Sequence, residues 1–70
     1  MKNTNAKKMI EEKLQASGLP MAYILQEVGL KQEATLWKQI EDRTITADKV
    51  QRLSSILHLR QEELRLFFAA

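Results

Sequence analysis

Residues 19–45, LPMAYILQEVGLKQEATLWKQIEDRTI, decide the fold of this chain. Pro20 suits the first turn of a helix, because its missing N–H would have no partner there in any case. Apolar residues then recur at helical spacing as far as Gly29, whose conformational freedom suits a helix end. A further amphipathic period runs from about residue 32 to Asp42. The stretch therefore predicts two short helices joined by a turn, a helix-turn-helix.

One more helix is predicted before this unit. The apolar period fits a helix over residues 6–16, with Asn5 as its cap and Gly18 as its C-terminal stop. Residues 1–5 are polar and carry no apolar period, so we expect them to form a flexible arm.

Two helices are predicted after the unit. Thr46 is a suitable hydroxyl cap for the first, and apolar residues follow it at helical spacing. The second is expected over residues 61–68. Because the sequence shows no two-residue alternation, we expect an all-α fold, a single compact domain of five helices over residues 6–70.

The composition sets the class of protein. The chain has 70 residues, of which 44% are apolar and 29% charged, and it has no cysteine. Such a chain builds one small core without disulfides or thiolate metal sites, so we expect association into a homodimer. No apolar run approaches the roughly 18 residues of a membrane span, and no signal peptide is visible. We therefore expect a cytoplasmic protein.

Charge is distributed unevenly along the chain. The formal net charge is +2, yet residues 20–45 hold three basic residues against four acidic ones. Much of the affinity of a protein for DNA comes from attraction between Lys or Arg and phosphate. Residues 20–45 have no excess of basic residues and so supply little of this attraction.

Several positions fit the pattern of a known family. The second predicted helix carries Ile24, Leu25, Val28 and Gly29, and the third ends in Ile40 and Glu41. A cap and spaced leucines follow in TADKVQRLSSILHLRQEEL. Over about residues 9–66 the chain resembles the Cro and phage-repressor type of helix-turn-helix, also called the Xre-like family. The resemblance implies a lambda-repressor-like domain that binds operator DNA as a dimer, with its third helix in the major groove.

The chain also departs from that pattern. Leu25 stands where the family usually has alanine, and the segment between Gly29 and Glu41 is about two residues longer. The family often has an arginine late in the first helix that pairs with the glutamate ending the third. Leu14 takes that place here, next to Lys13.

The polar side of the third helix supplies the candidate DNA contacts. Gln can form two hydrogen bonds with adenine, and Lys can donate to guanine. Arg43, after the helix, is placed to reach a phosphate. The alternative is a solvated helix face without a partner. The residues expected to face DNA are Lys31, Gln32, Thr35, Leu36, Lys38, Gln39 and Arg43.

Leu36 and Trp37 have more than one interpretation. Leu36 could touch a thymine methyl group, be partly buried, or form an apolar contact for a protein partner. Trp37 could anchor a partner, but its helical spacing with Ile40 favours packing in the core.

Residues outside the unit suggest little chemistry. Lys2, Lys7 and Lys8 could form an arm that enters a DNA groove, or a solvated tail. His58 is the only histidine and makes no metal site alone, so no metal or cofactor is expected. No nucleophile with a base and no phosphate loop is visible, so we do not expect an enzyme.

The last helix carries apolar residues that so small a domain cannot easily bury together. Adjacent helical residues point about 100° apart, so burying both Phe67 and Phe68 is difficult. One of them can close the core, and an exposed one indicates an association surface. The expected dimer or partner interface is formed by Leu64, Phe67 and Phe68.

Two functions follow from these observations. The first is a transcriptional regulator that acts by occupying operator DNA. The second is a helix-turn-helix module that binds and modulates a partner repressor protein, since fold does not fix function.

Overall fold

Five α-helices follow one another in the computed structural model, which describes residues 2–68. They are α1 (Thr4–Ser17), α2 (Met21–Val28), α3 (Glu33–Glu41), α4 (Ala47–Leu57) and α5 (Gln61–Phe68). Within residues 2–68 there is no β-strand. The predicted all-α, five-helix class is therefore confirmed.

Three of the helices end in a residue with left-handed backbone conformation. Gly18 (φ 69°) ends α1 and Gly29 (φ 79°) ends α2, as the sequence predicts. His58 (φ 56°) ends α4 in the same way without glycine's freedom, and its N–H donates to the Ser54 carbonyl oxygen. The connections after α1, α2 and α4 therefore begin with the same kind of turn.

The start of α1 differs from the prediction. The helix begins at Thr4, and the cap is Asn3, whose Oδ1 accepts the Ala6 N–H at 3.2 Å. The predicted cap, Asn5, is wrong, and the predicted flexible arm does not hold from Asn3 onward. Asn3 is only 5% exposed because it lies against other helices, and local sequence pattern does not reveal such contacts.

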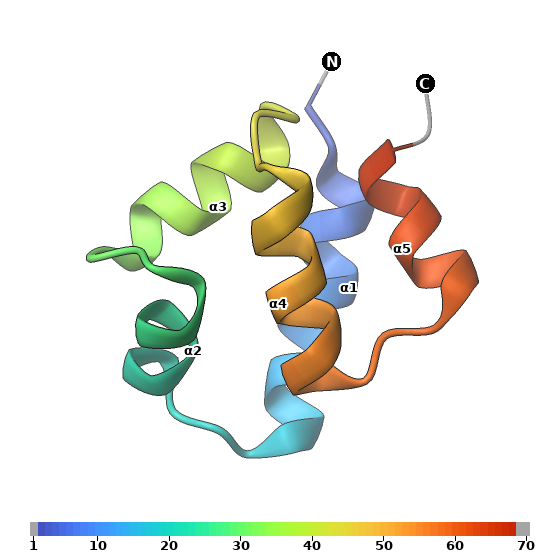
Figure 1. The fold of residues 1–70 in the computed structure, drawn as a ribbon. Helices are drawn as coiled ribbons and strands as arrows, with labels where there is room; N and C mark the ends of the chain where they lie inside the picture. Colours follow the sequence, from blue (N-terminus) through green and yellow to red (C-terminus); the bar gives the residue numbers. More distant parts are fainter. Residues whose placement is uncertain (1, 69–70) are drawn as a thin grey trace.

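The helices pack around one apolar core (Figure 1). α4 contacts α1, α2 and α5, while α1 also contacts α3 and α5, and α2 contacts α3. Burial of apolar side chains from all five helices stabilises this arrangement. The buried apolar residues are Ala6, Ile10, Ile24, Val28, Leu36, Ile40, Val50, Leu53, Leu57 and Phe67.

The connection between α2 and α3 is short. It comprises residues 29–32, close to the three to four residues usual in helix-turn-helix units. The Leu30 N–H donates to the Leu25 carbonyl oxygen at 2.9 Å, which closes the end of α2. Figure 1 shows α2 and α3 together on one side of α4.

None of the helices within residues 2–68 has the length and apolar character needed to cross a membrane.

Candidate nucleic-acid interface

α3 is held to the core by one side and exposes the other. Leu36 and Ile40 are fully buried, one turn apart, and fix the rotation of the helix about its axis. Lys38 lies on the opposite side and is exposed, and so are Lys31 and Gln32 in the preceding turn. These three polar side chains are therefore open to solvent.

Leu36 does not belong to this surface. Its exposure is 0%, so the predicted contact with DNA or with a protein partner is wrong. The reason is packing: Leu36 and Ile40 lie on the side of the nine-residue helix α3 that faces the other helices. Trp37 is half-buried and packs against the core, as its spacing with Ile40 predicts.

Gln39 and Thr35 lie at the margins of the exposed side. Both are half-buried, and the Gln39 Oε1 atom is covered without a hydrogen-bond partner. A paired contact with adenine needs both the oxygen and the nitrogen of the amide. The predicted paired contact from Gln39 therefore requires its side chain to change rotamer first.

Arg43 follows α3 in a left-handed conformation, with φ 60°. Its N–H donates to the Ile40 carbonyl oxygen at 3.3 Å, and the residue is exposed. Lys31, Gln32 and Lys38 are thus exposed on α3 and its preceding turn, while Arg43 follows the C-terminal end of α3.

The acidic residue that ends α3 is matched by lysines from the start of the chain. Glu41 Oε1 lies 3.2 Å from Lys7 Nζ, and Glu41 Oε2 lies 3.8 Å from Lys2 Nζ. These ion pairs remove one unopposed negative charge from the unit of residues 20–45. Lys7 also lies within α1, so of the two interpretations of Lys2, Lys7 and Lys8, arm or solvated tail, neither describes Lys7.

Lys13 pairs elsewhere. Its Nζ lies 3.0 Å from Glu63 Oε2, so the lysines beside Glu41 are Lys7 and Lys2, not Lys13. Sequence reasoning missed the lysine pairs because they depend on how α1 packs against α3.

The helix starts differ in how their N–H groups are bonded. Asn3 caps α1 and Thr46 caps α4, the latter accepting the Lys49 N–H at 3.3 Å, as predicted from its hydroxyl group. α2 and α3 follow Pro20 and Gln32, and neither makes a side-chain cap hydrogen bond. Uncapped N–H groups at a helix start attract anions such as phosphate.

The start of α5 is closed by an acidic side chain. Glu63 Oε1 accepts the Arg60 N–H at 2.8 Å. This backbone hydrogen bond, with Lys13 as the second cause, holds the pKa of Glu63 below its usual value. Glu63 thus joins α5 to α1.

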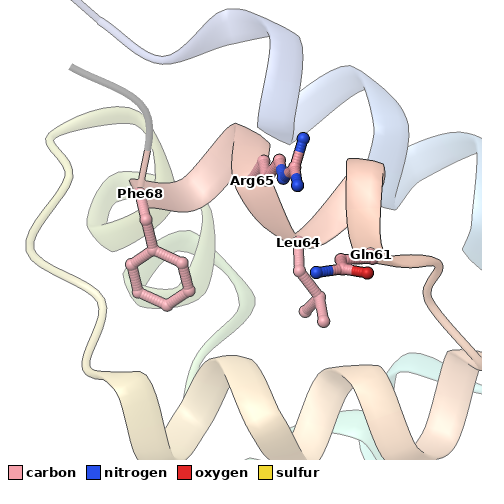
Figure 2. A pocket seen from close by; sticks show the side chains of 4 residues that line it. All are labelled: Gln61, Leu64, Arg65 and Phe68. Carbon is pink, nitrogen blue, oxygen red and sulfur yellow. The ribbon is translucent and has the colours of Figure 1, made fainter.

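The C-terminal helix separates its two phenylalanines. Phe67 is 6% exposed and closes the core, so its predicted place in an interface is wrong, whereas Phe68 is 61% exposed. Figure 2 shows Phe68 and Leu64 extending from α5 toward the same surface pocket. Its volume of about 320 Å³ is at the lower end of the range for small-molecule sites. The pocket is lined by Gln61, Leu64, Arg65 and Phe68.

No group of three metal-ligating side chains comes together within residues 2–68. Comparison of the chain with protein-family models, with curated proteins and with solved structures finds no match. The candidate interface is therefore defined by its own geometry: an anchored helix, α3, with a polar outer side, whose start, like that of α2, has no side-chain cap.

Proposed function

We propose that the protein is a DNA-binding transcriptional regulator of Cro or phage-repressor type, acting in the cytoplasm by operator occupancy without a catalytic step. The observation that carries the proposal is the orientation of α3. Its apolar residues Leu36 and Ile40 point into the core, which leaves Lys38 outward, and Lys31 and Gln32 in the preceding turn are exposed as well. In a helix-turn-helix this is the side that enters the major groove.

The electrostatics of the surface support the same function. Lys2 and Lys7 compensate Glu41, so the negative charge of the unit is smaller than its sequence indicates. The uncapped starts of α2 and α3 add N–H groups that attract phosphates. Phosphate contacts of this kind position a protein on DNA, while side chains on α3 select the bases.

A dimer completes the proposed arrangement. Binding sites of such regulators place two half-sites about 34–36 Å apart, each read by one protomer. Phe68 and Leu64 on α5 provide the self-association surface in this proposal, because an apolar side chain exposed beside a pocket gains from burial.

The experiment is a titration of fluorescently labelled duplex DNA taken from the neighbourhood of the gene, at about 50 and about 200 mM salt. We expect affinity to fall steeply with salt, because several phosphate contacts release counterions. Lys38→Ala should lower affinity for the preferred duplex by roughly ten-fold or more. Its stability should change by less than about 0.5 kcal/mol, since the side chain is exposed.

Arg60→Ala is the matched control. It removes one positive charge from an exposed residue in the connection between α4 and α5, away from α3. Equal losses of affinity for Lys38→Ala and Arg60→Ala would show that only total charge matters. That result would refute reading of DNA by α3.

A protein–protein module that modulates a partner repressor is the second candidate. The exposed Phe68 favours it, and Tyr23 on α2 is also 43% exposed. In that case the protein alone would not shift the duplex, and adding the partner regulator would change the partner's own shift. Binding between the two proteins would also depend little on salt.

A further inference from the structure

Asn3 lies where three helices meet. Its side-chain Nδ2 donates to the Leu66 carbonyl oxygen in α5 at 2.7 Å, and its backbone N–H donates to the Glu41 carbonyl oxygen of α3 at 2.7 Å. Its Oδ1 caps α1 by accepting the Ala6 N–H. With 5% exposure, Asn3 is the one polar residue classed as buried among residues 2–68. The bond to the Ala6 N–H is buried and the bond to the Leu66 carbonyl oxygen is partly buried, and losing a partner is costly where water cannot replace it.

These bonds connect α3 and α5 through the residue that caps α1. α1 packs against both α3 and α5. Lys7 and Lys2 strengthen the α3 side of this junction through their ion pairs with Glu41. On the α5 side, the Asn3 amide bonds directly to the last turn, next to Phe68. Figure 1 shows the first residues of the chain between the end of α3 and the end of α5.

We propose that Asn3 is a positioning residue: it fixes α3 relative to the last turn of α5, and so sets the affinity for a two-fold-symmetric DNA site without touching DNA. This inference rests on the proposed function, with α3 in the groove and α5 at the dimer contact. A dimer that binds two half-sites needs a fixed distance between its two α3 helices. A shift of α5 relative to α3 changes that distance but leaves each single α3 surface intact.

Asn3→Ser separates the two roles of the side chain. Serine is a preferred helix cap, so the hydrogen bond with the Ala6 N–H is kept, while the donor to Leu66 is lost. Asn3→Asp is the second variant, because it also keeps an acceptor for Ala6 and places a carboxylate against the Leu66 carbonyl oxygen. Ile10→Val is the control: it removes one methyl group from the core of α1 and leaves the junction in place.

The test uses a duplex selected from a random pool by the unmodified protein, and the same duplex with one half-site replaced. All variants are titrated well below their melting temperatures. We expect Asn3→Ser to change half-site affinity by less than about two-fold and to lower full-site affinity by roughly 5- to 30-fold. Asn3→Asp should lose at least as much, and Ile10→Val should keep both affinities. The inference would be overturned if Asn3→Ser lost the same affinity for both duplexes, or lost none. It would also be overturned if Ile10→Val lost affinity for the full site alone.

Amide hydrogen exchange tests the junction without DNA. In Asn3→Ser we expect faster exchange in the last turn of α5, where the bond to Leu66 is lost, with α2 unchanged, whereas Ile10→Val should show no such pattern. If the unmodified protein selects no duplex, the proposed function fails, and the exchange pattern alone decides whether Asn3 joins the two helices. If a duplex is selected but the exchange pattern is absent, the positioning role fails and the proposed function stands.

Discussion

The consecutive helices α3 and α4 are anchored alike but begin differently. Leu36 in α3 and Leu53 in α4 are both fully buried. α4 begins at Thr46, whose hydroxyl group accepts a backbone N–H, whereas Gln32 before α3 makes no such bond. The difference shows that the buried side of α3 is enough to hold the helix in the fold. Its first backbone N–H groups have no side-chain cap and can therefore bind a partner such as phosphate.

The largest effect is expected from the shared anchoring. Leu36→Ala and Leu53→Ala should each lower the free energy of unfolding by about 2–5 kcal/mol, because each leaves a cavity at a fully buried position. Urea unfolding followed by circular dichroism measures both. If Leu36→Ala alone lowered the free energy of unfolding by less than about 1 kcal/mol, α3 would be loosely held. The two helices would then not be anchored alike.

A smaller effect is expected at the start of α4. Thr46→Ala removes the acceptor for the Lys49 N–H and should lower stability by about 1 kcal/mol. Gln32→Ala should change stability by less than about 0.5 kcal/mol, because Gln32 makes no cap hydrogen bond. Thermal melting of the two variants compares them directly. Similar losses would show that α3 is capped after all.

A substitution at Gln32 can supply the side-chain cap that the start of α3 does not have. Gln32→Asp supplies a cap and a negative charge at the positive end of the helix, which should raise stability by about 0.5 kcal/mol. The same carboxylate should weaken DNA binding by repelling phosphate. Gln32→Asn adds a cap without the charge and serves as the control. A gain in both stability and DNA affinity for Gln32→Asp would contradict a phosphate contact at this position.

The smallest effect concerns the start of α5 and depends on pH. The Arg60 N–H and Lys13 hold the pKa of Glu63 below the ordinary range of a glutamate. A lowered carboxyl pKa stabilises the fold above the unfolded value, and this contribution is lost as the pH falls through the folded value. Glu63→Gln should therefore melt below the parent at pH 7, and the two melting temperatures should converge as the pH falls through the lowered pKa of Glu63. A gap between the two melting temperatures that stays constant with pH would show that the Glu63 charge contributes nothing.

Features that depend on neighbouring residues were predictable from the sequence. The five helices follow from apolar periodicity, and the stops at Gly18 and Gly29 follow from glycine's access to positive φ. The cap at Thr46 follows from its hydroxyl group. Each of these rests on chemistry within one or two turns of the chain.

Features that depend on distant residues were not predictable in this way. Asn3 bonds to a residue 63 positions along the chain, and the pairing of Lys7 with Glu41 needs α1 to lie against α3. For the candidate site, the exposed Lys31, Gln32 and Lys38 agree with the predicted polar side. Leu36 was misplaced because its candidate DNA contact came from the register of the resembled family. Its helical spacing with Ile40 instead places it on the buried side of the helix.

The hydrogen bond from Asn3 to Leu66 has a consequence for how the chain comes apart. Terminal segments usually fray first and are preferred sites of proteolytic attack. Here a single bond closes a non-covalent ring of almost the whole chain, since it joins residues 63 positions apart. Fraying of α1 and fraying of α5 then require the same bond to break, so the two ends should open together, and limited proteolysis should show both losing protection in one step.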